Sequence, residues 1–390
     1  MNEISKYCTG CSACTSICPK NCIELKKNIY GELEPVIDHA LCIKCGACRN
    51  VCPTIVQPCS NTPDKVFAAK SRDIHICERS TSGGLSMAIA KEILSVGGIV
   101  YGTELIGLEA KVIRIAELEK VSCIQGSKYL QSHMYDALIQ MKKDLLSGKK
   151  VVFLGTPCQI AGAKNYLKNY SENLFLVDIL CHGAPSQDCF KSGIELEIQE
   201  EVESLKFREN NRYCLNIKTK MGNQISIPYR RSYWFNSFVE ALIMREACYL
   251  CPYANTNRIG DISIGDFWGL GKAAQTQLDI DSGVNLVLIN NPKGAILLDM
   301  IRQSVDLEEH KLEEAILYNH PLSAPASVPK NYDKFKELYS KYGGKKALIK
   351  AYRKKTIFVF IRRLVNKNKK FHNVIIKLPI VGSKLTDYPR

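Results

Sequence analysis

The sequence predicts a mixed α/β and α+β chain in three parts: a small cysteine-rich N-terminal module, a larger mixed α/β domain and a basic C-terminal helical tail. Three observations predict this order. A cysteine quartet occurs twice near the N-terminus, strand-like and helix-like runs alternate through the middle, and lysine and arginine accumulate at the C-terminal end. Alternation of short strands and helices is typical of a sheet covered by helices.

Composition excludes several classes of protein. The 390 residues are enough for two or more domains, and 46% hydrophobic with 24% charged residues is ordinary for a folded protein. No apolar run approaches the roughly 18 residues of a membrane span, and the first ten residues lack a secretory signal, so we expect a cytosolic chain. Disulfides are rare in the cytosol, so the 18 cysteines are expected to bind metal or do redox chemistry.

The net charge of +14 is concentrated in the tail. Residues 330–390 contain 18 lysine or arginine residues and three acidic residues, so the rest of the chain is close to neutral. A uniformly basic body that binds nucleic acid is therefore not expected.

The N-terminal module carries two quartets with the spacing C-x2-C-x2-C-x3-C, offset by 34 residues and each followed by proline. Three closely spaced thiolates hold one 4Fe-4S cube, and the cysteine before proline crosses to the other cube. The spacing thus predicts two 4Fe-4S clusters in a ferredoxin-type domain over residues 1–58. One cluster takes Cys8, Cys11, Cys14 and Cys52; the second takes Cys42, Cys45, Cys48 and Cys18. A pair of zinc sites is the alternative, although zinc sites rarely use this spacing twice in register.

The elements of the first half follow in order. Residues between the quartets alternate around Gly31, which predicts a hairpin, and Gln57–Lys65 is polar and linker-like. Strands are expected at Val66–Ala69, Gly98–Tyr101, Lys111–Ile115, Lys150–Gly155 and Leu174–Leu180. Helices are expected from Ser82 through Leu94, at Met134–Leu146, at Pro157–Leu167 and after Pro185. These runs predict a largely parallel sheet over residues 66–200.

The second half, residues 201–330, changes character. Short alternating strands are expected from Val202 to Pro228, followed by a helix at Tyr233–Arg245. Strands at Asp261–Gly265 and Val284–Ile289 and a helix at Gly294–Arg302 complete it. The basic tail occupies residues 331–390.

Five segments carry a resemblance to a known family: Ser80–Leu94, Gln125–Ser132, Val151–Leu167, Val177–Ser186 and Cys248–Gly269. The chain resembles the family of beta subunits of coenzyme F(420)-reducing hydrogenases and dehydrogenases, in the form with a fused N-terminal ferredoxin. The resemblance implies a flavin, usually FAD, beside an iron-sulfur cluster in the larger domain, which makes residues 66–200 the first half of a flavin-binding domain.

Four further cysteines are candidates for a third 4Fe-4S cluster. Cys158 and Cys181 each follow a buried strand, and Cys248 and Cys251 form a C-x2-C pair before proline. Carboxyl ends of parallel strands meet at one edge of a sheet, where ligands bind. A redox-active pair or buried space-filling thiols are the alternatives. The remaining cysteines show no ligand spacing and are expected to be structural: Cys22, Cys59, Cys77, Cys123, Cys189 and Cys214.

The flavin site has weaker signals, because neither a dinucleotide-binding glycine motif nor a phosphate-binding loop is present. Two glycines at a helix start let a ligand approach the backbone, but ordinary helix capping gives the same pattern. The candidate flavin-binding residues are Ser82, Gly83, Gly84, Gly126, Ser127, Lys128, Tyr129, Gly155, Thr156, Pro157 and Gln159. Lys128 and His182 are the catalytic candidates, a cation beside the flavin and a proton relay, with a surface loop and a structural histidine as alternatives.

The tail segment Lys345–Lys370 has an apolar centre flanked by basic residues, which resembles an amphipathic helix on an anionic membrane. A solvated helix or disordered tail is the alternative, and nucleic-acid binding is not expected.

The combined expectation is a cytosolic flavin and iron-sulfur oxidoreductase, peripheral at the inner membrane face through its tail. Its partner would be a low-potential electron carrier or another redox enzyme. With its ferredoxin and flavin build and its basic tail, the chain resembles family members associated with bacterial surface-polysaccharide synthesis. Two alternatives stay open: an electron-transfer subunit that feeds a partner enzyme, and an iron-sulfur regulatory protein whose flavin site has decayed. The substrate, the electron donor, the direction of electron flow, any use of deazaflavin and the oligomeric state are left open by the sequence.

Overall fold

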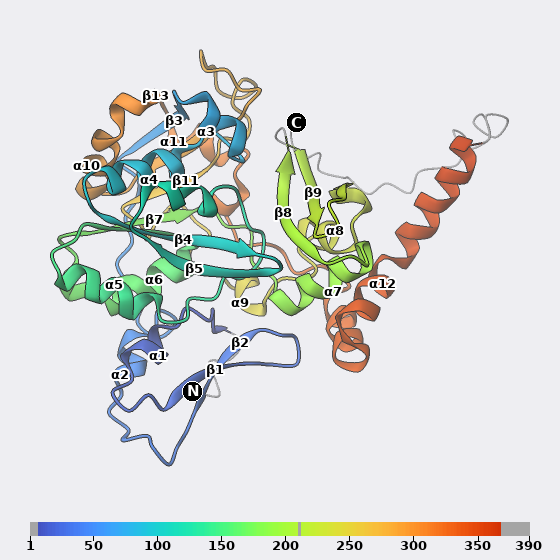
Figure 1. The fold of residues 1–390 in the computed structure, drawn as a ribbon, viewed down its shortest axis with the longest axis horizontal. Helices are drawn as coiled ribbons and strands as arrows, with labels where there is room; N and C mark the ends of the chain where they lie inside the picture. The colour runs from blue at the N-terminus through green and yellow to red at the C-terminus, as the bar shows by residue number, and fades with distance from the viewer. Residues whose placement is uncertain (1–6, 210–211, 368–390) are drawn as a thin grey trace.

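The computed structural model describes residues 7–209 and 212–367, with side chains as far as Ala351. Figure 1 shows the N-terminal module beneath a large helix-covered sheet, with a second, smaller sheet and a long helix to one side. Both helices and strands are substantial, so the predicted mixed α/β class is confirmed.

The N-terminal module consists of two short helices and a hairpin. Helices α1 (Ala13–Ile17) and α2 (Ala47–Val51) each begin after the second cysteine of a quartet and end just before its last cysteine. Strands β1 (Ile23–Lys27) and β2 (Leu33–Ile37) pair antiparallel around Gly31, which confirms the predicted hairpin.

The core of the larger domain is an eight-stranded sheet. Its order is β13 (Val305–His310), β3 (Lys65–Ser71), β12 (Asn285–Ile289), β11 (Ile262–Asp266), β7 (Leu174–Ile179), β6 (Val151–Gly155), β4 (Ile99–Ile106) and β5 (Glu109–Ile115). Strands from residues 66–200 and from residues 201–330 thus share one sheet.

Within residues 66–200 the expectation of a largely parallel sheet is confirmed for β4, β6 and β7 but not for β5, and the complete eight-stranded sheet is mixed. Only the central strands β11, β7, β6 and β4 pair in parallel; the pairings on both flanks are antiparallel. The hairpin β4–β5 returns directly after a short turn, so its two strands pair antiparallel. Strand β13 follows β12 through α10, but it pairs with β3, which runs opposite to both β12 and β13. Strand β13 was not expected from the sequence.

Helices cover both faces of the sheet. On one face lie α3 (Ile74–Arg79), α4 (Leu85–Ser95) and α10 (Pro292–Met300); on the other lie α5 (Ala137–Leu146), α6 (Pro157–Tyr166) and, further along, α11 (Leu312–Ile316). The alternation of β6 shows the division, because Val152 faces the first layer while Val151 and Phe153 face the second.

A second body contains the three-stranded antiparallel sheet β8 (Val202–Glu209), β9 (Arg212–Thr219) and β10 (Gln224–Pro228). Helices α7 (Gln187–Glu197), α8 (Tyr233–Val239) and α9 (Glu246–Tyr249) pack with it around an aromatic core that includes Trp234 and Phe190. The helix expected at Tyr233–Arg245 is too long. It ends at Val239, because Ala241 adopts a left-handed conformation with φ 56°.

Short 3-10 helices complete the connections: η2 (Leu118–Ile124), η3 (Lys168–Tyr170), η4 (Tyr229–Arg231), η5 (Arg302–Ser304) and η6 (His320–Leu322). The last helix, α12 (Tyr332–Lys367), is interrupted at Gly343 and contacts α7 and α8. Part of the amphipathic segment predicted at Lys345–Lys370 lies outside the described residues, as does the rest of the tail. Within the part of the chain that the structure describes, no helix has the length and apolar character needed to cross a membrane.

Candidate iron-sulfur and flavin sites

The eight cysteines of the two quartets surround two cavities in the N-terminal module. The first, of about 360 Å³, is lined by Cys8, Cys11, Cys14 and Cys52. The second, of about 210 Å³, is lined by Cys18, Cys42, Cys45 and Cys48. Each cavity therefore collects three cysteines of one quartet and the last cysteine of the other, the crossed arrangement that the spacing predicts. We call them the first and the second outer site.

Local backbone geometry produces this crossing. Ser12 and Gly46 precede the two short helices in left-handed conformations, with φ 63° and 75°, and turn each cysteine loop sharply into its helix. Helices α1 and α2 pack against each other. Their C-terminal ends carry Cys18 and Cys52 to the cavity of the opposite quartet.

A ninth cysteine, Cys22, also lines the second outer site. Its Sγ lies 3.4 Å from the Sγ of Cys18. From the sequence Cys22 was expected to be structural, because it stands outside the quartet spacing. Its place just after the proline of the first quartet was the only signal, and the spacing rule does not use it.

The four inner cysteines come together at the C-terminal edge of the central parallel strands. Cys158 lies in the first turn of α6 after β6, and Cys181 follows the neighbouring strand β7. Cys248 lies in α9 and Cys251 just beyond it. Burial raises the pKa of all four thiols, and repulsion from the other inner thiolates raises it further for Cys181, Cys248 and Cys251. Such repulsion requires proximity, so the four form one group, called here the inner site.

The inner thiols suit a cluster that supplies positive iron. Burial and the neighbouring thiolates raise the pKa of Cys251 to about 11 and that of Cys248 to about 12. Thiolates are the ligands of iron, and bound metal deprotonates a coordinating thiol outright. Among the side chains that the structure describes, within residues 7–209 and 212–351, no three of His, Cys, Asp or Glu are arranged to hold a single metal ion.

The first outer site and the inner site are neighbours across helix α6. A Cβ on Gly162 of α6 would lie only 2.8 Å from the Sγ of Cys11. Tyr253 lies near both sites: it packs in the same cluster as Cys11, Cys158 and Cys251, and thiolates of both sites raise its pKa in addition to burial. The two sites share one apolar core.

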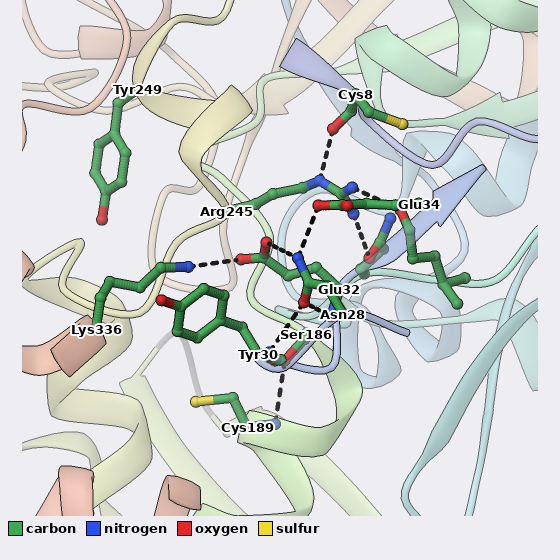
Figure 2. A network of polar contacts seen from close by, with 12 residues as sticks. Cys8, Asn28, Tyr30, Glu32, Glu34, Ser186, Cys189, Arg245, Tyr249 and Lys336 are labelled. Atoms are coloured by element: carbon green, nitrogen blue, oxygen red, sulfur yellow. Dashed lines mark hydrogen bonds and ion pairs between the residues drawn. The ribbon is translucent and has the colours of Figure 1, made fainter. Parts of the chain in front are cut away.

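The hairpin of the N-terminal module is fixed to the second body by a polar network (Figure 2). Lys336 of α12 lies 3.4 Å from Glu32 and 3.3 Å from the ring centroid of Tyr30. Ser186 at the start of α7 donates to the Tyr30 carbonyl at 2.6 Å, and Lys27 pairs with Asp188. The module is thus held in one position relative to the inner site.

The two glycines proposed to meet a flavin face protein atoms instead. A Cβ on Gly83 would lie 2.5 Å from the Ala69 carbonyl oxygen, and one on Gly84, with φ 81°, would lie 2.5 Å from Ile76. Ser82 donates to the Val284 carbonyl. Close packing and backbone conformation therefore account for both glycines without a ligand.

A neighbouring seam between the large sheet and the three-stranded sheet holds several of the flavin candidates. Thr81 and Ser127 hydroxyls lie 2.9 Å apart, and Arg208 of β8 donates to the Thr81 carbonyl at 2.6 Å. Tyr129 packs among aromatic rings that include Phe207 and Phe238. The seam combines hydroxyls, a cation and aromatic faces, and Gly126 there has no atom within 4 Å of its Cβ position. Arg208 was not among the residues expected from the sequence, because no motif surrounds it.

The remaining flavin candidates lie apart from this seam. Thr156 and Gln159 form a capping box with Pro157 at the start of α6, and Gln159 also donates to Ser132. A Cβ on Gly155 would contact Phe153. These residues position Cys158, whose Sγ lies 3.3 Å from the Thr156 hydroxyl.

The two catalytic candidates are both enclosed. Burial lowers the pKa of Lys128 to about 7, and its amine donates to the carbonyls of Ile124 and Gln125. His182 packs against Phe238, and within the described structure its Nε2 is buried without a hydrogen-bond partner. Burial lowers the pKa of His182.

Two crossed four-cysteine cavities beside a third cysteine group define the class: an iron-sulfur electron-transfer protein of the oxidoreductase type. Comparison with known families shows which of them two segments of the chain are similar to. Residues 7–56 match the 4Fe-4S dicluster domain, and residues 148–315 match the family described as coenzyme F(420) hydrogenase/dehydrogenase, C terminus of the beta subunit. Residues 148–315 are thus similar to this family and residues 7–56 to a 4Fe-4S dicluster domain, in agreement with the resemblance seen in the sequence.

Relatives span most of the chain. The protein named as the F subunit of F(420)H(2) dehydrogenase from Methanosarcina mazei is 25% identical over 318 residues, covering 77% of this chain and 84% of the relative. A chain in a xenon-derivatized structure of the F(420)-reducing NiFe hydrogenase complex from Methanosarcina barkeri is 17% identical, with a TM-score of 0.45. That match covers 77% of this chain and 95% of the other.

Proposed function

We propose that this chain is an iron-sulfur flavoprotein oxidoreductase with three 4Fe-4S clusters, two in the outer sites and one in the inner site, and an FAD. When bound, the clusters would carry single electrons and the flavin would exchange hydride with a substrate or a deazaflavin coenzyme. The observation that supports this best is the contact of α6, which carries Cys158, with Cys11 of the first outer site, beside Tyr253 near both sites. It supports a consecutive order: second outer, first outer, inner.

The chain's own residues would hold these groups as follows. The crossed cysteines would hold the outer clusters, and Cys158, Cys181, Cys248 and Cys251 would hold the inner one. For the flavin, the residues that fit are those of the seam: Thr81, Ser127, Lys128, Tyr129 and Arg208. Arg208 is itself held by Asp266 at 2.7 Å, so its guanidinium stays fixed at the seam.

Iron and flavin analysis of anaerobically purified protein tests this proposal. At four irons per cube, three clusters give about 12 iron atoms per chain. Cys251→Ala should lose about four of them and leave the dicluster domain intact. About eight iron atoms in the unaltered chain, unchanged by Cys251→Ala, would contradict the inner cluster. Arg208→Ala should lose flavin and keep iron; full retention of flavin would move the flavin away from the seam.

A second candidate function is an electron-transfer subunit without a substrate of its own, which feeds a partner enzyme. It is favoured by the similarity to a relative that is itself named as one subunit of a dehydrogenase. Substrate turnover by the isolated chain with an artificial electron donor would argue against it. Loss of all turnover without a partner chain, with clusters and flavin intact, would support it. A protein with clusters but no flavin would instead be the regulatory alternative.

The tail suggests where a substrate would be met. We propose that its basic residues bring the chain to an anionic membrane face, as expected for a role in surface-polysaccharide synthesis. Full-length protein should sediment with phosphatidylglycerol vesicles at low salt, and a chain cut before Lys345 should not. Equal sedimentation of both would end this proposal.

A further inference from the structure

Arg245 is a deeply buried cation that contacts only neutral oxygen atoms. Its guanidinium donates to the carbonyls of Cys8 and Leu33, both at 2.6 Å, and to the side-chain oxygen of Gln131 at 3.2 Å. The residue is only 4% exposed. Within the described structure, no carboxylate forms an ion pair with it.

The two other deeply buried arginines are different. Arg258 pairs with Asp178, and Arg208 pairs with Asp266. A buried charge is costly unless an opposite charge compensates it. Arg245 therefore requires a source of negative charge other than the described side chains that hydrogen-bond to it.

The position of Arg245 identifies that source. Its carbonyl accepts from the backbone N–H of Cys248 at 2.9 Å, so it lies at the entrance to the inner-site helix α9. Its side chain reaches the Cys8 loop of the first outer site, as Figure 2 shows. Its positive charge also lowers the pKa of Cys8, Cys158 and Cys248 against the larger effect of burial, so both sites lie within its field.

Cubes held by four thiolates are anions and gain one further negative charge on reduction. A fixed cation between two such groups stabilises the reduced form of each more than the oxidised form. Because Arg245 is buried, salt screens its electrostatic interaction with the clusters only weakly.

We propose that Arg245 is the shared counter-charge of the first outer cluster and the inner cluster, raising the reduction potential of both and so assisting electron passage between them. It is a positioning residue as well, since it ties the Cys8 loop and the hairpin to the inner-site loop. This inference rests on the proposed function, because it requires clusters in both sites.

The test is a redox titration of each cluster by electron paramagnetic resonance in anaerobic protein. In Arg245→Gln, the ratio of reduced to oxidised cluster at the original midpoint should fall about tenfold for the first outer and inner clusters. The second outer cluster serves as the internal control and should not shift. Arg245→Lys, which keeps the charge, should retain most of the original potential.

A second control separates charge from docking. Lys336→Met removes a cation from the same module interface, but one that has Glu32 as its partner. It should leave the first outer and inner potentials unchanged. Equal shifts in Lys336→Met and Arg245→Gln would overturn the inference, as would unchanged potentials in Arg245→Gln with iron retained.

Loss of iron is also decisive. If Arg245→Gln loses a cluster, recovery of iron and potential in Arg245→Lys supports the charge, and failure of both variants assigns Arg245 to hydrogen bonding alone and overturns the inference. Failure of the proposed function is distinguishable, because it appears as about eight iron atoms in the unaltered chain. In that case the reduction potential of the first outer cluster can still be compared between Arg245→Gln and the unaltered chain.

Discussion

Lys128 shows how a single buried group makes stability depend on pH. Part of the residue is exposed, but its amine is enclosed by protein, and burial lowers its pKa to about 7. An unfolded lysine titrates near a pKa of about 10.4. Between these values the unfolded chain binds a proton that the folded chain does not, so stability rises with pH across this window. Below about pH 7 the charge is buried and the destabilisation is fully present.

The prediction compares Lys128→Met with the same substitution at the exposed Lys206. As the pH rises from about 7 to 10, the urea midpoint of the unaltered chain should rise relative to that of Lys128→Met. Lys206→Met should track the unaltered chain at every pH. Parallel curves for the unaltered chain and Lys128→Met would mean that the amine titrates normally.

Residue-scale prediction from the sequence worked where chemistry fixes the spacing. Two-residue gaps and a following proline predict which thiols share a cavity, and the cavities agree. It is less decisive where a residue type has several uses. Packing against Ala69 and Ile76 already accounts for Gly83 and Gly84, so a flavin contact at these glycines stays a prediction. Arg208 could not be predicted, because the contact with Thr81 joins segments far apart in the chain.

Among the elements, helix α6 is the one that joins the two kinds of site. It begins with a Thr-Pro capping box, carries Cys158 in its first turn and packs Gly162 against Cys11 of the N-terminal module. Glycine in a helix interior normally costs about 0.5–1 kcal/mol relative to alanine. The close approach of Cys11 explains why glycine stands here.

Replacing glycine by alanine inside a helix usually stabilises a protein, but Gly162→Ala should instead be destabilising for the first outer site. The new Cβ would lie 2.8 Å from the Cys11 Sγ, so a ligand of the first outer site must move. We expect loss of up to about four iron atoms per chain and a weakened signal of that cluster, more severe for Gly162→Val.

The control is Gly222→Ala, in the turn before β10, where a Cβ meets no atom within 4 Å. It strains a backbone with φ 88° but touches no cysteine, so iron should be retained. Full iron in Gly162→Ala, with the first cluster spectroscopically unchanged, would show that Cys11 can adapt at no cost.

Element-scale prediction was most accurate for the central strands. Apolar runs such as Val151–Gly155 are buried on both faces and occur in parallel sheets, and β6 and β7 do pair in parallel. The direction of the strands at the two edges of the sheet was predicted less well, because it depends on the connection between strands and not on the apolar run itself. The polar strand β13 lacks an apolar run, and its pairing with β3 is set by tertiary position.

At the scale of the whole molecule, the N-terminal module presents its second outer site to solvent while the first faces the large domain. Cys45 is exposed, and so are Leu41 and Ile43, each at 57%. Three exposed basic residues line the same cavity: Lys20, Lys44 and Arg49. Among the described residues, no acidic side chain lines it. An electron carrier that docks here would reach the cluster farthest from the inner site.

Charge at this rim predicts an acidic one-electron carrier protein as the partner. Opposite charge around a docking site accelerates association, and salt screens the effect. Dithionite-reduced plant-type ferredoxin, which is acidic, is a suitable probe. Its rate of cluster reduction should fall about tenfold or more between about 0.05 and 0.5 M salt. The combined variant Lys20→Glu, Lys44→Glu, Arg49→Glu should remove most of this salt dependence and slow the reaction at low salt.

The matched control changes the same charge elsewhere: Lys206→Glu, Lys272→Glu, Arg302→Glu, at exposed positions on the rest of the molecule. It should change the rate much less, because charges beyond a Debye length of about 10 Å are largely screened. Reduced methyl viologen, a small cation, should not be slowed by the rim variant, which separates docking from cluster damage. If the rim and control variants slow ferredoxin equally, only net charge matters and carriers do not enter at the second outer site. A rim-specific loss would instead make the second outer cluster the point of electron entry or exit, with the first outer and inner sites following it toward the seam.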